Sequence, residues 1–313
     1  MVGYVTDDTH VAVVTGEKRP ELTADGQSLM VALRERGFDA TPAVWSDPGV
    51  EWTDFDVALL RSCWDYHEAI DAFRELIADL EAAGVTLRNP AEVIRWNVHK
   101  SYLRDLADAG VPTLDTAWVE ASDDPDIELE GLLRDRGWEQ AVVKPAVGTR
   151  SVGTWRTSID EASEHQDRFN ERRESGDVLV QAFAPEIRDG ERSLVFFGGE
   201  FSHASNAVPA PDDFRSHHSF GGTNEPYDPP RSIVEQGQEI VRRTSDIFGI
   251  DPVALPYARV DGIERDGEFR LIELELIEPF LGLERAEGAV DRFADAIERS
   301  LRLDSTAAGT EDS

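Results

Sequence analysis

Short apolar segments alternate with helical patterns over the first part of this chain, and this alternation limits the folds open to it. Residues 11–15 (VAVVT) and 57–60 (VALL) are short apolar runs typical of buried strands. Residues 22–36 carry leucines at helical spacing before Gly37, and residues 69–83 repeat such a pattern before another strand signal, VTL. Strand–helix–strand order predicts a parallel sheet, with ligands at the carboxyl ends of its strands.

The pattern changes after Val178, where strand-like segments follow one another. These segments are VLVQAF, ERSLVFF, EFSHASNAV, ALPYARV and FRLIELELI. One helical pattern near 233–248 lies among them, and residues 289–301 form a last amphipathic pattern. Before the change, a helix is expected around 97–109, followed by a strand, a helix that ends at Gly137 and the strand AVVK. We therefore predict an α/β first part and an α+β, mostly antiparallel second part.

The length of 313 residues exceeds the usual size of one domain, so we expect packed subdomains. We assign an N-terminal parallel α/β domain to residues 1–95 and a central subdomain to 96–180. A C-terminal subdomain with a metal site would span 181–303. Residues 304–313 (DSTAAGTEDS) are small and polar, which predicts a disordered tail.

The charge of the chain excludes several classes of partner. Asp and Glu number 63 against 31 Lys and Arg, so the formal net charge is -32, and nucleic acid and anionic membranes should be repelled. The chain has no apolar run of 18 residues and no basic, cleavable N-terminus. Cys63 is the only cysteine, which excludes an intrachain disulfide and a cysteine-only metal site. We expect a cytoplasmic enzyme with small-molecule partners, and a homodimer is compatible with this composition.

Lysine is nearly absent, with Lys18, Lys100 and Lys144 as its only instances. An acidic chain with so little lysine is typical of a salt-rich cytoplasm, so we expect a halophilic source; the plainer reading of the acidity is solvation alone. Lys144 closes the strand AVVKP, where its ammonium could neutralise an anion or simply reach the solvent. The scarcity of lysine favours a role in anion binding for Lys144 and, less strongly, for Lys100.

The strand Leu271–Ile277 carries two glutamates. Alternation puts Leu271, Glu273 and Glu275 on one face and the apolar side chains of Ile272, Leu274 and Leu276 on the core face. Asp261 ends the preceding strand, and a hairpin would bring it beside Glu273. Three carboxylates on one surface suit Mg²⁺ (or Mn²⁺) that carries phosphate oxygens. The alternative is a solvated acidic face.

Two further segments have weaker signals. Gly148 and Gly153 in PAVGTRSVGTWR predict a flexible loop whose amides could cover phosphates, although an ordinary hairpin loop would look the same. The strand VLVQAF continues into APEIRDGERS, and a strand that becomes a linker can present its backbone to an adenine edge. A later acid could accept hydrogen bonds from ribose hydroxyls.

The segment Arg61–Tyr66 (RSCWDY) directly follows a predicted parallel strand, where ligands bind. Arg61 could clamp a substrate carboxylate, Asp65 could hold an amine, and Trp64 would lie beside them. The alternative is an Arg61–Asp65 pair with Trp64 in the core. We interpret Cys63 as a buried bystander thiol.

The order of these pieces resembles the ATP-grasp superfamily: a helical lysine, a strand Lys-Pro, a glycine loop, a hinge, an acid and Asp…Glu-x-Glu. Within it the chain looks like the ribosomal-protein glutamate ligases and glutathione synthetases. It is more similar still to the cyclo-ligases of cycloserine biosynthesis, through RSCWDY, LVQAFAPEI, SLVFFGGEFSHA, DDFRSHHSFGG, YARVD and ELELIEP. The resemblance covers residues 57–298 and implies an ATP-grasp fold behind an N-terminal parallel-sheet domain.

The resemblance also implies roles for individual residues. Lys100 and Lys144 match lysines that hold ATP phosphates, and Arg215 matches an arginine near the transferred phosphoryl group. The remaining matches are Gln181, Ala182 and Phe183 for the adenine hinge, Glu191 for the ribose, and Asp261, Glu273 and Glu275 for the metal. Many members carry Asn where this chain has Glu275, which leaves that ligand open.

The implied activity is ATP-dependent ligation. A small-molecule carboxylate would be activated as an acyl phosphate and attacked by an amine or similar nucleophile, with release of ADP and phosphate. One rival is an intramolecular ligation of the cycloserine type. Two others are a regulator that binds ATP without turnover and an acidic interaction scaffold.

Overall fold

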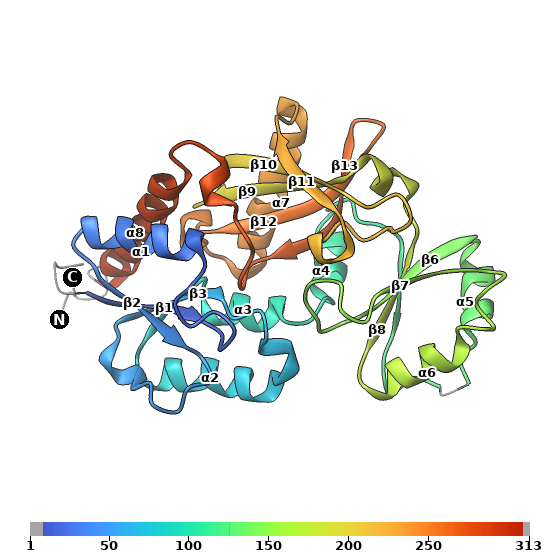
Figure 1. Ribbon diagram of the computed structural model, residues 1–313, viewed down its shortest axis with the longest axis horizontal. Coiled ribbons are helices and arrows are strands. Elements are labelled where there is room, and N and C mark those ends of the chain that lie inside the picture. Colours follow the sequence, from blue (N-terminus) through green and yellow to red (C-terminus); the bar gives the residue numbers. More distant parts are fainter. Residues whose placement is uncertain (1–8, 125, 309–313) are drawn as a thin grey trace.

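The computed structural model describes residues 9–124 and 126–308. Three sheets succeed one another along the chain, and Figure 1 shows the N-terminal sheet at the left, the central sheet at the right and the C-terminal sheet above and between them. The parallel first sheet and the two antiparallel sheets confirm the predicted fold class. None of the helices within the described ranges is long and apolar enough to cross a membrane.

The N-terminal sheet is wholly parallel, with strand order β2-β1-β3-β4. Its strands are β1 (His10–Thr15), β2 (Asp39–Val44), β3 (Val57–Ser62) and β4 (Thr86–Arg88), and its helices are α1 (Ala24–Glu35), α2 (Ile70–Ala82) and α3 (Ala91–Asn97). Helix α1 begins two residues later than its leucine pattern suggested, because Leu22 has a positive φ of 67°. The Thr23 side chain caps the helix by accepting from the Gly26 amide.

The central sheet is antiparallel, with strand order β5-β8-β6-β7. Its strands are β5 (Thr116–Val119), β6 (Gln140–Pro145), β7 (Trp155–Ser158) and β8 (Val178–Ala182), and α4 (Tyr102–Asp108), α5 (Leu129–Arg136) and α6 (Gln166–Glu174) accompany them. The helix predicted around 97–109 corresponds to α4, which begins later than expected, at Tyr102, because α3 already ends at Asn97. The Lys100 amide between them donates to the Ala146 carbonyl instead of to a helical partner, at 2.8 Å.

The C-terminal sheet has strand order β11-β10-β9-β12-β13 and is antiparallel throughout. Its strands are β9 (Glu191–Phe197), β10 (Glu200–Val208), β11 (Thr223–Tyr227), β12 (Ala258–Arg265) and β13 (Glu268–Glu275), and the helices are α7 (Arg231–Phe248) and α8 (Ala289–Ala308). Short 3₁₀ turns lie at Trp52–Asp54, Tyr66–Glu68, Pro185–Asp189, His218–Phe220, Pro252–Ala254 and Leu283–Arg285.

A tight turn joins β12 to β13. Asp266 and Gly267 both have positive φ, 55° and 79°, which matches the Asp-Gly preference of two-residue hairpins. Asp261 pairs with Glu273, as the hairpin predicted, but Gly262 then pairs with Leu271. Because of this register shift, the side chains before Glu273 do not lie on the faces of the sheet that regular alternation predicts. Leu271 is therefore buried in the core, and Ile272 packs beside another apolar cluster, contrary to the simple alternation assumed for this strand.

The end of the chain differs from its prediction. Helix α8 runs to Ala308, so the tail expected to be disordered from residue 304 begins inside a helix, and residues 309–313 lie outside the described part. Helix α8 lies beside α1 at the N-terminal sheet (Figure 1), and Phe293 shares one core with Val11 and Leu29. The last helix thus ties the C-terminal part to the N-terminal sheet.

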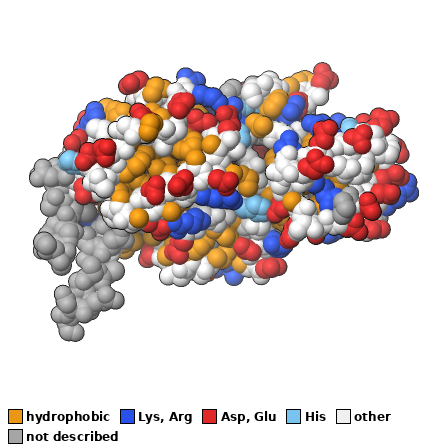
Figure 2. All heavy atoms as spheres, turned by 90° about the horizontal axis from the view of Figure 1, so that it is seen from below, with side chains coloured by type: hydrophobic (Ala, Val, Ile, Leu, Met, Phe, Trp, Pro, Cys, Tyr) orange, Lys and Arg blue, Asp and Glu red, His pale blue; other side chains and the backbone are white. Residues whose placement is uncertain are grey.

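Acidic side chains are spread unevenly over the surface. Figure 2 shows them crowded at the right end of the molecule, where α5 and α6 lie in Figure 1, whereas hydrophobic side chains gather in the left half of this face. The carboxylates seen at this end lie in contact with solvent, where salt can screen them.

Candidate functional site

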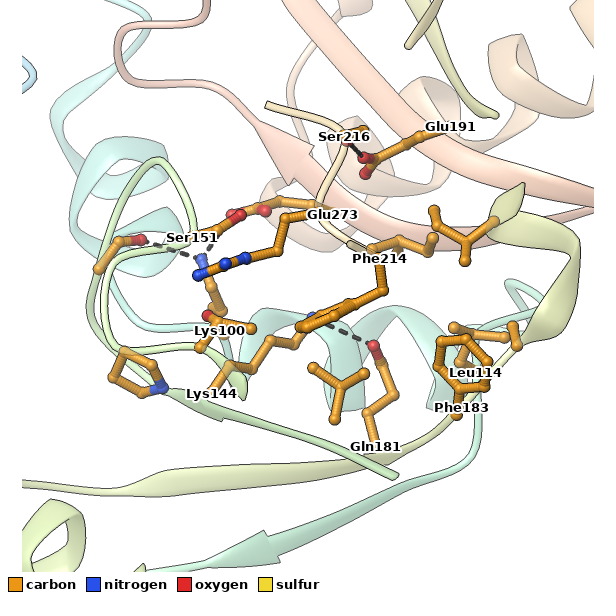
Figure 3. Close-up of a pocket in the computed structure, with 18 of the residues that line it drawn as sticks. Lys100, Leu114, Lys144, Ser151, Gln181, Phe183, Glu191, Phe214, Ser216 and Glu273 are labelled. Carbon is orange, nitrogen blue, oxygen red and sulfur yellow. Dashed lines mark hydrogen bonds and ion pairs between the residues drawn. The ribbon is translucent and has the colours of Figure 1, made fainter. Parts of the chain in front are cut away.

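A cavity between the central and C-terminal sheets brings most of the expected residues together (Figure 3). We call it the hinge cavity. From the sequence-predicted set, its lining includes Lys100, Lys144, Gln181, Ala182, Phe183, Glu191, Arg215 and Glu273. The loop 148–152 also lines it, so the glycine loop lies where amides could meet a ligand.

Lys144 lies at the end of β6 with its side chain almost wholly buried, 7% exposed. Its ammonium donates to the Gln181 Oε1 at 3.1 Å and has no carboxylate within ion-pair distance in the described part of the chain. Burial lowers the pKa of Lys144 to about 8, although the charge of Glu273 acts in the opposite direction. This group has a strong electrostatic reason to bind an anion.

Lys100 precedes α4 and is 9% exposed. Its ammonium lies 2.5 Å from a Glu273 carboxylate oxygen and 3.1 Å from the Gly148 carbonyl, contacts visible at the left of Figure 3. Burial would raise the pKa of Glu273, but the ammonium groups of Lys100 and Lys144 hold it below its usual value. Lys100, which is expected to bind phosphate, is therefore paired with Glu273, which is expected to bind the metal.

The hinge follows β8 and has an apolar wall. Leu114, Phe183 and Ile187 contribute to this wall, and the Arg156 guanidinium lies 5.2 Å from the Phe183 ring. The amides of Ala182 and Phe183 are already used, because they donate to the carbonyls of residues 115 and 140. A ligand in this cavity must therefore accept its hydrogen bond from a different backbone amide near this wall.

Glu191 begins β9 and accepts a hydrogen bond from the Ser216 hydroxyl. Burial raises its pKa to about 7, and the charge of Asp261 adds to the effect. Arg215, next to Ser216, donates to Asp213 at 2.7 Å and lies 3.5 Å from the centre of the Phe220 ring. The Arg215 hydrogen bond is the main reason that the pKa of Asp213 falls to about 2.

The three carboxylates of the β12–β13 hairpin line a second, adjoining cavity of about 1300 Å³. We call it the wide cavity; Lys100, Glu191 and Glu273 line both cavities. Arg259 bridges two of the acids, at 2.9 Å from Asp261 and 2.5 Å from Glu275. Burial disfavours its charge, yet these acids raise the pKa of Arg259 above its usual value. Burial also raises the pKa of Glu275, which Arg259 partly offsets.

Sequence reasoning did not single out Arg259, although it lies within the quoted motif YARVD. No three Asp, Glu, His or Cys side chains in the described ranges converge into a ready metal shell. The acids of the hairpin are instead paired with Arg259 and Lys100. Mg²⁺ rarely needs such a shell, since it binds through one or two carboxylates together with phosphate oxygens and water. The donor set therefore fits Mg²⁺ that arrives with a phosphate.

The Arg61–Tyr66 segment is only partly at the site. Trp64 and Asp65 line the wide cavity, and Asp65 accepts from the Trp45 indole at 2.8 Å. Arg61 lies elsewhere: it is 5% exposed, donates to the Pro279 carbonyl at 2.8 Å and packs against the Tyr257 and Phe293 rings. The structure does not bring Arg61 to the cavity, and it does not pair Arg61 with Asp65.

Cys63 is fully buried, and burial raises the pKa of its thiol, which agrees with its interpretation as a bystander. Three arginines that the sequence did not single out, Arg19, Arg150 and Arg285, line the wide cavity. In the part of the chain that the structure describes, none of these arginines has a carboxylate within ion-pair distance, although acids outnumber bases twofold. Arginine is too common in this sequence for its type alone to have identified them.

The chain is similar to several known proteins. A family model described as D-cycloserine synthetase DcsG, N-terminal domain, matches residues 11–89. The cycloserine biosynthesis protein DcsG of Streptomyces lavendulae is 29% identical over 310 residues, which are 93% of this chain and 99% of that protein. A glutathione synthetase of Rhodopseudomonas palustris is 30% identical over 176 residues, 55% of this chain and 52% of the relative.

Solved structures give the same result. The crystal structure of D-cycloserine synthetase DcsG has a TM-score of 0.85 and 27% identity, and covers 93% of this chain and 99% of its own. The ATP-grasp ligase PsnB, in a complex with a precursor variant, Mg and ADP, has a TM-score of 0.62 at 18% identity and covers 94% and 99%. The second similarity concerns the fold alone.

Proposed function

We propose that this chain, which belongs to the ATP-grasp superfamily of ATP-dependent carboxylate–amine ligases, activates a small carboxylate as an acyl phosphate. The observation that carries the proposal is the hinge cavity. It gathers two nearly buried lysines, a hinge, a buried acid and a hairpin glutamate from segments far apart in the sequence.

ATP would lie in the hinge cavity with its adenine against Leu114, Phe183 and Ile187. Since the amides of Ala182 and Phe183 donate within the sheet, the next amide, that of Ala184, is the better donor to the adenine edge. Glu191 would accept from a ribose hydroxyl. Lys144, Lys100 and the loop amides would hold the phosphates, and Arg215 would leave Asp213 to approach the γ-phosphoryl group.

Asp261, Glu273 and Glu275 would hold the metal, and Mg²⁺ would supply neutralisation of the phosphate charge. This requires Lys100 and Arg259 to exchange their carboxylate partners for anionic oxygens of the substrates. The site then stays close to neutral, because each released cation finds a new anion.

The reaction has two steps. A substrate carboxylate oxygen bonds to the γ-phosphorus as the β–γ bridging P–O bond breaks, and ADP leaves. A nucleophile then bonds to the acyl carbon as the C–O bond to phosphate breaks, and the nucleophile loses a proton. Arg19, Arg150 and Arg285 are better candidates than Arg61 to bind the substrate carboxylate, because they line the wide cavity without acidic partners.

The similarity to DcsG over nearly its whole length supports a second form of this activity, in which one substrate is activated and closes a ring on itself. ADP release tests the common step. With Mg-ATP and a panel of D- and L-amino acids, with and without hydroxylamine, at least one carboxylate should stimulate ADP release. ATP binding without ADP release across the panel would favour a non-catalytic regulator.

Three further expectations remain proposals. We propose a cytoplasmic and halophilic setting, where ATP is available and the acid excess is screened, and a homodimer as the assembly to test. We also propose the subdomains 1–95, 96–180 and 181–303. Their support is the succession of three sheets, although β8 continues to Ala182, two residues past the second boundary.

A further inference from the structure

Glu278 is a buried carboxylate that the function above does not use. It lies three residues beyond the metal-binding strand and is 5% exposed, and it belongs to the wall of the wide cavity. One of its carboxylate oxygens, Oε1, has no hydrogen-bond partner among the described residues. Buried carboxylates are nearly always paired, because removing an unpaired charge from water is costly.

The backbone around Glu278 is held firmly. The Trp64 indole donates to the Glu278 carbonyl and the Arg61 guanidinium to the Pro279 carbonyl, both at 2.8 Å. The Tyr257 hydroxyl lies 2.9 Å from the Ile277 carbonyl. The segment Arg61–Tyr66, which begins in β3, thus fixes the backbone beyond β13 that carries Glu278. Arg61 therefore has a structural role beside the site.

The charged groups around Glu278 are of both signs. Burial raises its pKa to about 7, with Arg259 and Arg61 acting against the shift and Glu273 with it. The charge of Glu278 in turn raises the pKa values of Cys63 and Tyr66, whose shifts burial dominates, so these groups also lie near it. Its surroundings therefore shift the pKa of this carboxyl group upward, chiefly through burial.

We infer that Glu278 binds the attacking nitrogen through a hydrogen that this nitrogen carries. The inference rests on the proposed ligation and assigns the residue that holds its nucleophile. A carboxylate accepts hydrogen bonds and attracts a cation, so it suits an ammonium, an amine or a similar N–H group. It would repel a thiolate or a second carboxylate, and as part of the cavity wall this carboxyl group gives the N–H group an acceptor.

The position of Glu278 fits this role. It shares the cavity wall with Asp261, Glu273 and Glu275, next to which the acyl phosphate would form. Glu278 lines the wide cavity but not the hinge cavity. A nitrogen held there would therefore approach the acyl carbon from the side opposite the hinge cavity. Glu278 is thus a binding residue that orients the nucleophile.

The test uses the full chain, Mg-ATP, the amino-acid panel as carboxylates and hydroxylamine as the nitrogen nucleophile, with hydroxamate and ADP as products. Glu278→Gln keeps the shape and removes the charge. Its KM for hydroxylamine should rise at least tenfold, while ATP affinity and the KM for the carboxylate stay unchanged. Glu278→Asp should recover part of the loss, and Glu284→Gln, an exposed glutamate outside both cavities, should match the wild type.

Each other outcome overturns a different statement. An unchanged KM for hydroxylamine in Glu278→Gln, with the wild type forming hydroxamate, would reject the role of Glu278 and leave the ligation intact. Loss of ATP affinity in that variant would also reject the role, since Glu278 would then support the nucleotide. If the wild type gives neither ADP nor hydroxamate with any carboxylate, the proposed function fails and this inference with it.

Discussion

The ammonium of Lys100 lies 2.5 Å from the carboxylate of Glu273, although the two residues are 173 positions apart in the chain. One is expected to hold phosphate and the other to hold the metal. If they have these roles, ATP and Mg²⁺ would each have to break the contact, so the binding of one would prepare the site for the other.

Glu273→Gln should change nucleotide binding in two opposite ways. Without divalent metal, ATP should bind more tightly than to the wild type, because Lys100 is released and one negative charge near the phosphates is gone. With Mg²⁺, turnover should fall by roughly 10- to 100-fold or more. Calorimetric titration in a chelator and ADP assays measure both effects. Glu268→Gln on the same strand lies outside both cavities and is the control. If the variant and the wild type bound ATP with equal affinity without metal, Lys100 would not be a phosphate-binding residue.

The pKa of Lys144 near 8 predicts a pH dependence of ATP binding. The lysine is charged below pH 8 and loses its proton as the pH rises through that value, so ATP affinity should fall by about tenfold per pH unit above it. Lys144→Arg should bind ATP with an affinity that is nearly flat from pH 7 to 9.5, because guanidinium stays charged. Parallel pH dependence in both proteins would remove Lys144 as the cause.

Arg61→Lys should lower stability and leave the nucleotide site intact. The guanidinium lies between aromatic rings and donates to the buried Pro279 carbonyl, and a lysine reproduces neither the planar stacking nor the fixed donor direction. We expect a loss of about 1–3 kcal/mol in the free energy of unfolding. Denaturant unfolding and ATP titration of the same protein measure both properties. A stable variant with weakened carboxylate binding would restore the clamp that the sequence suggested.

Gly237 in α7 allows the helix to approach the C-terminal sheet. A Cβ atom there would lie 2.6 Å from Leu194 Cδ1 and 2.9 Å from a Phe196 ring carbon. Gly237→Ala gains up to about 1 kcal/mol of helix propensity but should lose more through overpacking, which typically costs about 1–3 kcal/mol. In Gly131→Ala in α5 the new Cβ meets its nearest atom at 3.7 Å, so this variant should gain stability. If denaturant unfolding showed that both variants change the free energy of unfolding in the same direction, the packing argument would be contradicted.

The net charge of -32 predicts a strong response to salt. Repulsion between carboxylates should destabilise the folded chain at low ionic strength, and the Debye length falls from about 10 Å at 0.1 M to about 3 Å at 1 M. The melting temperature should therefore rise between these concentrations of KCl. Sucrose at matched water activity controls for general solute effects, and a flat profile would show that charge repulsion does not limit stability.

Local patterns in the sequence were sufficient for most of the strands and helices and for one part of the site. Alternating strand and helix signals predicted the parallel sheet, and the Asp-Gly turn with its flanking strands predicted the pairing of Asp261 with Glu273. Such features depend on residues close together in the chain, where period and turn chemistry set the geometry. The scarcity of lysine added Lys100 and Lys144, because rarity makes a residue type informative.

Contacts between distant segments decided the rest. The sequence contains Arg259, Arg61 and Glu278, but only the folded chain puts Arg259 between two carboxylates, turns Arg61 away from the cavity and leaves an oxygen of Glu278 without a partner. The irregular register at Leu271 was equally invisible, since alternation assumes regular pairing. The partner of a charged side chain depends on how the three sheets pack against one another. Hydrophobic periodicity and composition do not specify which distant segments come into contact.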